Sequence, residues 1–324
     1  MAGFQGSFDH QGSYDLNDLV VERGATLMAV SPNRSHTFRG DTITLDFPEL
    51  DTEFRVRIAD FVNEPLGTLI YMDQDALIEA IPYTRAIAHH AGWQWRIPLQ
   101  HRNGNGLVYS SSHCSDDEAA DILLNNLDSK AIGEPRIIRF RTGRTRKQWH
   151  RNVVAVGLSS GFLEPLESTS IYLIQSAVVR LIHLFPHTGV TPELMDEYNR
   201  QSQTEYELIR DFIILHYYLN ERNDTQFWRD LRQMDVPERI TRKNELFRAN
   251  GGLQQDQLDI FLEPSWLQVM LGQGVVPRDY HPLADALTEE QLREKLSKTK
   301  MLKNQPLAKM PGHDQFLEMF CKSA

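Results

Sequence analysis

The sequence predicts an α/β protein: a mixed sheet with helices, followed by a mostly α-helical region. Residues 20–72 carry β-branched and aromatic residues at alternating positions, which is typical of strands. Residues 152–157, NVVAVG, are an unbroken apolar run of the kind that fits a buried parallel strand. From residue 191 onward, helix-start and helix-stop signals replace the strand pattern. A sheet-containing part followed by a helical part is the fold class that accommodates all three observations.

The chain before residue 81 is expected to be a polar arm followed by strands. Residues 1–19 are rich in Gly, Ser and Asp, which predicts a flexible arm. Leu66–Met72 predicts the last strand of this part. The strands before it are predicted over LVVERGATLMAV, DTITLDF and EFRVRIADFV, with Pro, Gly and Asn between them.

The segment from 81 to 190 is predicted to mix strands and helices. Two strands, WQWRIPLQHR and GLVYSSS, are expected to be joined through residues 103–106, because Asn105-Gly106 is a favoured hairpin turn pair. Residues 115–118 combine a hydroxyl with three acidic residues, which suits the donor-rich first turn of a helix. The elements predicted here are thus the hairpin, a helix from Ser115 to Leu127, strands over RIIRFRTG and NVVAVG, and an apolar helix from about Ser168 to Phe185.

Helices are predicted for most of the remaining chain. Residues 191–250 begin with Thr191-Pro192-Glu193, a hydroxyl cap followed by Pro at the first helical position. Gly251-Gly252 ends this helical stretch. Further helices are expected over 264–272, 288–297 and 313–321.

Composition excludes several classes of protein. The 324 residues carry 34 Lys and Arg against 44 Asp and Glu, and a net charge of −10 argues against a general nucleic-acid binder. A hydrophobic content of 41% is too high for a disordered chain. The two cysteines, Cys114 and Cys321, supply neither a disulfide framework nor a four-cysteine zinc site, which favours a reducing compartment. With no apolar run long enough to span a bilayer and no secretory signal at the start, we expect a cytoplasmic protein.

The junction between the apolar strand and the following helix is a candidate anion site. A helix N-terminus presents unpaired amide donors and the positive end of its dipole, and Ser168 and Thr169 add hydroxyl donors. Glu167 stands at this junction, where a carboxylate can act beside a small anion and an aromatic substrate. A structural interpretation stays open, in which Glu167 favours the helix dipole and the hydroxyls cap the helix.

Trp93 and Trp95 are the second candidate. Residues two apart in a strand face the same way, so both indoles are expected on one face. Two adjacent indoles form a large rigid apolar wall. Such a wall either packs in a core or shields a reactive species from water.

These motifs resemble the flavin-dependent halogenases of the tryptophan halogenase family. WQWRIP matches the WxWxIP signature of that family, and GFLEPLESTSIY resembles its second marker, a Pro-Leu-Glu-Ser-Thr run. Flanking stretches such as NGNGLVYSSS and FWRDLRQMDVPERI follow in the family's order. The resemblance covers about residues 81–324.

The resemblance implies halogenation of an electron-rich aromatic ring. Reduced FAD, supplied by a separate flavin reductase, reacts with O2 and with chloride or bromide, and the hypohalous acid passes through a tunnel to an indole-like or phenol-like substrate. It implies a catalytic role for Glu167, with Ser168 at the end of the tunnel. The other implied residues are Thr169 and Ser170 at the halide through their amides, Leu158 and Ile171 at the flavin through backbone groups, and Trp93, Trp95, Ile97 and Pro98 along the tunnel.

The implied fold is the C-terminal part of a flavoprotein-monooxygenase-like FAD fold followed by a helical substrate region. Residues 1–80 are unassigned, residues 81–190 are expected to hold the flavin, halide and tunnel sites, and residues 191–324 are expected to bind substrate. The family's N-terminal GxGxxG turn for the FAD pyrophosphate does not occur in the sequence, and no lysine precedes Lys130 to match the family's catalytic lysine. The alternative expectation is a truncated, non-catalytic halogenase-like protein that lacks the FAD-binding half.

Two further inferences concern metal and substrate. His89, His90, His101 and His113 have no carboxylate or cysteine at ligand spacing in the sequence, so no metal site is predicted. In family members that act on free tryptophan, a tyrosine pair helps hold the amino acid, and the matching stretch here, SWLQVMLGQG, has none. The resemblance therefore favours a simpler indole, a phenol or a carrier-tethered aromatic.

Overall fold

The computed structural model describes residues 67–321 apart from 76–81, 100 and 141, and before residue 67 it describes the backbone of short strands. The chain forms two compact units, and both are discontinuous in sequence. The first unit combines the described parts of 1–67 with 139–215 and 255–262, and the second combines 68–138, 216–254 and 263–321. The predicted segments 1–80, 81–190 and 191–324 divide the chain by role and stay a prediction.

A six-stranded sheet forms the base of the first unit. Strand β14 (Val153–Val156) pairs in parallel with β6 (Thr52–Ile58), which confirms the prediction of a buried parallel strand. The sheet has the order β1 (Ser13–Asp15), β4 (Ser35–Arg39), β5 (Thr42–Phe47), β6, β14 and β13 (Trp149–His150). Two smaller pairs are β2 (Val20–Glu22) with β3 (Ala25–Leu27), and β12 (Gly143–Arg144) with β15 (Gly161–Phe162). The predicted arm over residues 1–19 lies outside the described residues except for β1.

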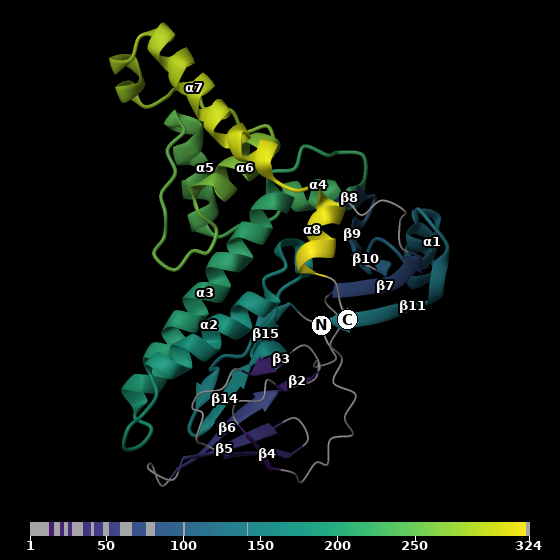
Figure 1. The fold of residues 1–324 in the computed structure, drawn as a ribbon, viewed down its shortest axis with the longest axis vertical. Helices are drawn as coiled ribbons and strands as arrows, with labels where there is room; N and C mark the ends of the chain where they lie inside the picture. Colours follow the sequence, from purple (N-terminus) through teal and green to yellow (C-terminus); the bar gives the residue numbers. More distant parts are fainter. Residues whose placement is uncertain are drawn as a thin grey trace. The chain divides into compact units, whose positions relative to one another are not determined.

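Helices α2 (Ser170–His183) and α3 (Pro192–Tyr218) run side by side in the first unit (Figure 1). Pro192 occupies the first position of α3, as predicted. The ring of Trp149 meets that of Tyr198 edge-on, with 5.5 Å between centroids. The core joins the sheet to both helices through Trp149, Val154, Val156, Ile174, Ala177, Val178, Leu181 and Tyr198.

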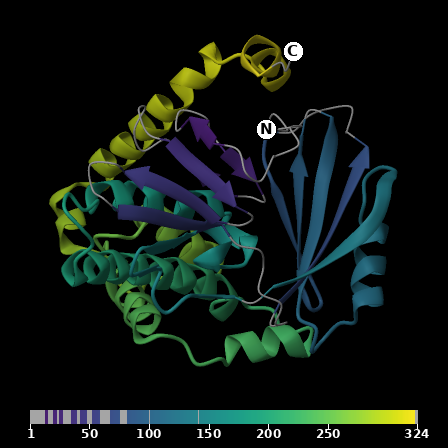
Figure 2. The ribbon, with the colours of Figure 1, turned by 90° about the horizontal axis from the view of Figure 1, so that it is seen from below.

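The second unit contains a five-stranded sheet with helix α1 (Asp116–Asn125) on one face (Figure 2). Ser115 caps α1 by accepting a hydrogen bond from the amide of Glu118 at 3.2 Å, which confirms the predicted start. The strand order is β11 (Ala131–Phe140), β7 (Gly67–Asp75), β10 (Arg102–Tyr109), β9 (Gly92–Pro98) and β8 (Arg85–His89). The core between sheet and helix consists of Ile70, Met72, Ala91, Leu107, Tyr109, Cys114, Ala119 and Leu123.

The hairpin turn predicted at Asn105-Gly106 is wrong. Those residues lie inside β10, and the chain reverses between Pro98 and Arg102, where the amide of Leu99 donates to the carbonyl of Arg102 at 2.8 Å. Gly106 is required in the strand for a different reason: a Cβ there would lie 2.3 Å from the ring of Trp95. The glycine makes room for an indole on the neighbouring strand.

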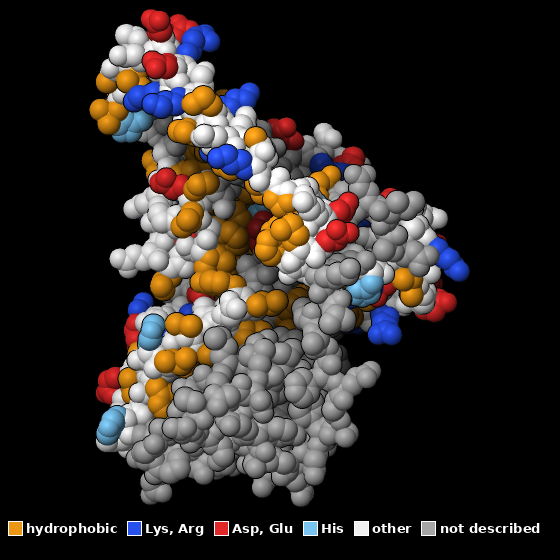
Figure 3. Space-filling model, viewed as in Figure 1, with side chains coloured by type: hydrophobic (Ala, Val, Ile, Leu, Met, Phe, Trp, Pro, Cys, Tyr) orange, Lys and Arg blue, Asp and Glu red, His pale blue; other side chains and the backbone are white. Residues whose placement is uncertain are grey.

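The remaining helices lie at the predicted positions, except that the helix predicted over 288–297 continues to Asn304. Gly251 adopts a left-handed conformation with φ of 74° and caps α5, as the Gly-Gly pair indicated. The helices are α4 (Gln226–Arg232), α5 (Glu238–Asn250), α6 (Glu263–Gly272), α7 (Glu289–Asn304) and α8 (His313–Phe320). Hydrophobic side chains gather over α8 in Figure 3, where Phe316, Met319 and Phe320 are exposed. Within the described part of the chain, no helix combines the length and the apolar character needed to cross a bilayer.

Candidate functional site

The segment 165–171, which we call the glutamate turn, leads into helix α2. Residues Pro165–Glu167 form a single 3-10 turn, closed by a hydrogen bond from the amide of Ser168 to the carbonyl of Pro165 at 2.9 Å. Ser168 is left-handed, with φ of 53° and ψ of 38°. A residue with a Cβ pays about 1–2 kcal/mol for this conformation, and such positions concentrate at functional sites. The turn holds half-buried Glu167 next to the start of the helix.

Helix α2 begins at Ser170, two residues later than predicted, because the left-handed Ser168 interrupts the helical backbone. The first helical hydrogen bond runs from the amide of Leu173 to the carbonyl of Thr169 at 2.9 Å. The amides of residues 170–172 therefore have no acceptor within the helix. Thr169 occupies the cap position but its side chain makes no capping hydrogen bond. The simple hydroxyl-capping interpretation is thus wrong for Thr169, whose side chain does not occupy the helix amides that an anion would bind.

Leu158 lies in another tight turn, directly after β14. Residues Gly157–Ser159 form this turn, and the hydroxyl of Ser159 accepts a hydrogen bond from the amide of Val156 at 3.0 Å. Next to it, the hydroxyl of Ser160 donates to the carbonyl of Gly157 at 2.7 Å and contacts the hydroxyl of Tyr206 on α3 at 3.0 Å. Helix α3 therefore holds the turn that presents the backbone of Leu158.

A buried ion pair fixes α2 against α3, ten residues after the start of α2. The guanidinium of Arg180 donates to Glu205 at 2.8 Å, and the hydroxyl of Ser176 donates to the same carboxylate oxygen at 2.9 Å. The side chains of Arg180 and Glu205 are 8% and 6% exposed. Burial, together with the charge of Glu205, raises the pKa of Tyr172 to about 12, so this phenol stays neutral at physiological pH.

The other predicted side chains lie on β9 in the second unit. Trp93, Trp95 and Ile97 occupy one face of this strand, as predicted, and we call them the tryptophan wall. Trp93 is buried, while Trp95 and Ile97 are half-buried. The facing positions of β10 are Val108, Gly106 and Gly104. Pro98, the last residue of β9, lies on the opposite face and is half-buried.

Two glycines and a tyrosine hold the indole of Trp95. Beside the close approach at Gly106, a Cβ at Gly104 would lie 3.2 Å from the same ring. The ring of Tyr71, on β7, stacks on Trp95 with 5.8 Å between centroids. The Nε1 of Trp95 is shielded from solvent without a hydrogen-bond partner among the described residues. The wall thus holds a flat indole in place and carries one available N–H donor.

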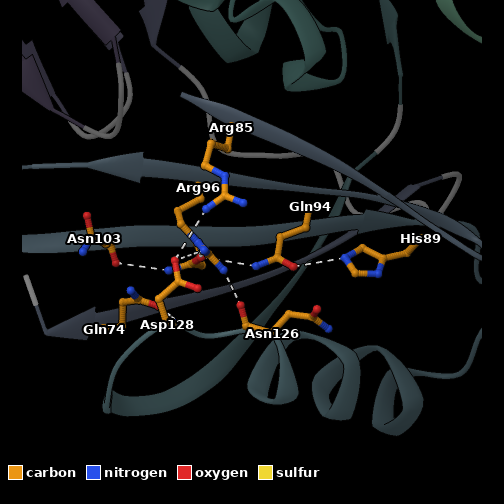
Figure 4. Close-up of polar contacts among 9 residues, drawn as sticks. Gln74, Arg85, His89, Gln94, Arg96, Asn103, Asn126 and Asp128 are labelled. Carbon is orange, nitrogen blue, oxygen red and sulfur yellow. Dashed lines mark hydrogen bonds and ion pairs between the residues drawn. The ribbon is translucent and has the colours of Figure 1, made fainter. Parts of the chain in front are cut away.

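The opposite face of the same sheet carries a buried polar network (Figure 4). The oxygen of the Asn105 side chain accepts hydrogen bonds from Arg96 Nε at 3.0 Å and from Gln94 Nε2 at 3.2 Å. Arg96 also binds the carboxylate of Asp128 and the carbonyl of Asn126. The sequence analysis missed this network. Its signal was the polar residues at every second position of residues 94–96 and 103–105, alternating with the tryptophans and glycines of the wall face.

One of the four histidines considered above, His90, lies beside a cysteine and a carboxylate. Among the described residues, ligand atoms of His90, Cys114 and Glu118 lie within 4.8 Å of one another. Burial and the nearby carboxylate of Glu118 raise the pKa of the Cys114 thiol to about 12. Of the other candidates, His89 contacts the side-chain oxygen of Gln94 at 3.0 Å, and burial lowers its pKa. Sequence spacing did not reveal this group because His90 lies 24 residues before Cys114, although Cys114 and Glu118 are only four residues apart.

The predicted site residues therefore fall into two groups. Leu158 and the glutamate turn with Ile171 belong to the first unit, and the tryptophan wall with Pro98 belongs to the second. Ile171 is 56% exposed at the start of α2, beside the available amides. This end of α2 offers an apolar surface and N–H donors together. The roles predicted for all these residues remain predictions.

Comparison with known proteins gives one consistent family. A family model described as tryptophan halogenase matches residues 65–289. Tryptophan 7-halogenase KtzQ of Kutzneria sp. (strain 744) is 33% identical over 238 residues, covering 68% of this chain and 44% of its own length. Tryptophan 6-halogenase SttH of Streptomyces toxytricini is 38% identical over 216 residues, covering 64% of this chain and 41% of its own length. This chain thus spans less than half the length of these curated relatives.

Solved structures agree with the sequence comparison. Xcc4156, a flavin-dependent halogenase from Xanthomonas campestris, matches with a TM-score of 0.78 at 44% identity, over 80% of this chain and 52% of that one. BrvH, a flavin-dependent halogenase from Brevundimonas sp. BAL3, matches with a TM-score of 0.75 at 44% identity, over 79% of this chain and 52% of that one.

Proposed function

Because this chain belongs to the tryptophan halogenase family, we propose that it acts in a flavin-dependent halogenase, which places chloride or bromide on an electron-rich aromatic ring. The observation that carries the proposal is the glutamate turn. It combines a half-buried carboxylate, Glu167, with the available amides at the start of α2. A halide and a developing positive charge require such donors and such a carboxylate side by side.

The residues at the start of α2 fit a flavin with a halide beside it. The exposed side chain of Ile171 gives an apolar surface for a planar ring, and the amides of Thr169 and Ser170 give donors for an anion. When bound, reduced FAD with O2 supplies the oxidising equivalents that convert the halide into a halogenating species. The family usually has Gly at the position of Ser170, and the amide is the same in either residue. The backbone of Leu158 and Ile171 contacts the flavin in this proposal.

The remaining steps belong to side chains of this chain. Glu167 stabilises the positive charge that forms on the aromatic ring when it gains the halogen, and its carboxylate accepts the proton that the ring then loses. Ser168 sets the direction of the turn that carries Glu167. In this proposal Trp93, Trp95 and Ile97 line the path of the halogenating species and exclude water from it, and Pro98 ends the strand that carries them.

The substrate proposed is an indole, a phenol or a carrier-tethered aromatic, with reduced FAD supplied by a separate flavin reductase. Trp266 stands in the stretch where relatives acting on free tryptophan have a tyrosine pair. It is buried, with the ammonium of Lys243 lying 4.5 Å from its ring centroid. Trp266 thus packs in the core of the second unit, which supports a substrate other than free tryptophan. Cys114 and Cys321 form no disulfide in the described part of the chain, which supports a reducing compartment such as the cytoplasm.

The test uses Glu167→Gln with Glu193→Gln as a control for loss of one negative charge. Each protein receives FAD, a flavin reductase, O2, bromide and indole, and bromoindole is measured by mass spectrometry. We expect Glu167→Gln to lose at least the 10²-fold that removal of a positioned general base costs, while flavin binding is retained. Glu193 is exposed on α3 and its variant is expected to match the wild type. Unchanged turnover in Glu167→Gln would remove Glu167 from the mechanism.

A second function is a halogenase-like binding module without turnover. The absence of a GxGxxG turn and of a lysine before Lys130 favours it. FAD titration of the purified chain, followed by absorbance, separates the two: uptake with bromoindole formation supports the enzyme, and no uptake supports the module.

A further inference from the structure

The second unit contains a group of three side chains with the chemistry of a zinc site. His90 follows β8, Cys114 ends the loop before α1, and Glu118 lies in the first turn of α1. Their ligand atoms lie within 4.8 Å of one another, although His90 lies 24 residues before Cys114 in the chain. Imidazole nitrogen, thiolate sulfur and carboxylate oxygen are the ligands that Zn²⁺ uses in proteins.

The contact between His90 and Glu118 is unusual for an ion pair. His90 Nε2 lies 3.1 Å from Glu118 Oε1, yet Nε2 is shielded from solvent and makes no aligned hydrogen bond. Two ligand atoms on one tetrahedral zinc ion, each bound at about 2.0–2.2 Å, lie about 3.3 Å apart and point at the ion rather than at each other. The observed spacing and misalignment match that arrangement. The side chain of Glu118 is 51% exposed, so it is free to rotate and bring its carboxylate into bonding distance of the ion.

The backbone around the three residues is already fixed. The carbonyl of His90 accepts a hydrogen bond from the hydroxyl of Thr225 at 2.6 Å, and the amide of Cys114 donates to the carbonyl of Ser110 at 3.0 Å. Glu118 is held by the cap that Ser115 forms on its amide. Cys114 itself packs in the core between sheet and helix. Little ordering is left for an incoming ion to impose.

We propose that His90, Cys114 and Glu118 bind one zinc ion, with a water molecule as the fourth ligand. The thiol of Cys114 releases its proton to solvent as the sulfur–zinc bond forms, His90 binds through its neutral Nε2, and Glu118 binds as the carboxylate. The two negative ligands neutralise the charge of the ion. The bound ion links His90, which follows β8, to the start of α1. His90 lies three residues before Trp93 in the chain.

Cobalt(II) is the probe, because it occupies tetrahedral zinc sites and absorbs light when a thiolate coordinates it. The 324-residue chain, stripped of metal with a chelator, is titrated with Co²⁺ and then with Zn²⁺. We expect a thiolate-to-cobalt charge-transfer band that saturates at one Co²⁺ per chain and disappears as Zn²⁺ displaces it. The melting temperature is expected to rise with the concentration of Zn²⁺, because the ion binds the folded state.

The two cysteines provide a matched pair of variants. Cys114→Ser is expected to lose the band, and Cys321→Ser, which removes the exposed thiol, is expected to retain it. Glu118→Gln, a change at the surface of α1, is expected to fold as the wild type does. Its apparent affinity for Co²⁺ should fall by at least the ~10-fold that loss of an outer-shell partner costs. A wild type without the band at saturating Co²⁺, a band that survives Cys114→Ser, or unchanged affinity in Glu118→Gln would overturn the site.

Discussion

The glutamate turn and the tryptophan wall present their groups in opposite ways. The turn presents backbone N–H groups at the start of α2, and its shape depends on the left-handed Ser168. The wall presents indole side chains, and its shape depends on the absence of Cβ atoms at Gly104 and Gly106. Side-chain changes that keep the backbone angles are therefore tolerated in the turn, whereas one added methyl group on β10 displaces the wall.

Helix α2, which follows the turn, and strand β9, which carries the wall, each also hold a buried arginine, and the two arginines differ in their partners. Arg180, on α2, pairs with Glu205, and both side chains are nearly inaccessible to water. Arg96, behind the wall, pairs with Asp128, whose side chain is 40% exposed. Arg96 keeps its hydrogen bonds to Asn105 and Asn126 when Asp128 is lost, whereas Nε and Nη1 of Arg180 make no hydrogen bond among the described residues. The packing of α2 thus depends more on Glu205 than the packing of the wall depends on Asp128.

Among these variants, replacement of Glu205 is expected to have the largest effect on stability. Glu205→Ala leaves Arg180 buried without its counter-charge and should lower the free energy of unfolding by about 3–5 kcal/mol in urea titrations. Asp128→Ala should cost less, because Arg96 keeps its hydrogen bonds to Asn105 and Asn126. The control is Glu207→Ala on the same helix, whose carboxylate lies 3.9 Å from Arg144 at the surface. This control should cost below about 1 kcal/mol, and equal losses for Glu205 and Glu207 would contradict the comparison.

A graded series of glycine replacements tests the wall. Gly106→Ala brings a Cβ within 2.3 Å of the Trp95 ring and should cost about 1–3 kcal/mol, measured from urea unfolding midpoints. Gly104→Ala, with a contact of 3.2 Å, should cost less. Gly272→Ala at the end of α6, where no atom lies within 4 Å, should cost nothing measurable and serves as control. If Gly104→Ala lowered the stability as much as Gly106→Ala does, the distance to the Trp95 ring would not explain the cost of these variants.

The smallest effect on stability is expected for replacements of Ser168 in the glutamate turn. Ser168→Gly removes the Cβ from a left-handed residue, while Ser168→Ala keeps the Cβ and removes only the hydroxyl. The glycine variant should therefore be more stable than the alanine variant by about 0.5–1 kcal/mol in thermal unfolding. An alanine variant as stable as the glycine variant would show that the turn stores no backbone strain.

Sequence reasoning located elements well where local signals and burial agree. The apolar run 152–157 became the parallel strand β14, and Ser115 became the cap of α1. It was wrong at Asn105-Gly106, where a turn signal lost to packing against Trp95. It also placed the start of α2 two residues early, because no local pattern announces a left-handed serine.

The sequence by itself determined the motifs of the two candidate regions: the paired tryptophans on one face of a strand, and a glutamate before an apolar helix. Periodicity of two residues and of 3.6 residues acts over neighbouring positions, so these features can be read along the chain. Only the tertiary structure decided which distant residues meet. The pairing of Arg180 with Glu205 and the meeting of His90 with Cys114 and Glu118 depend on helix packing and strand order, which no local spacing specifies.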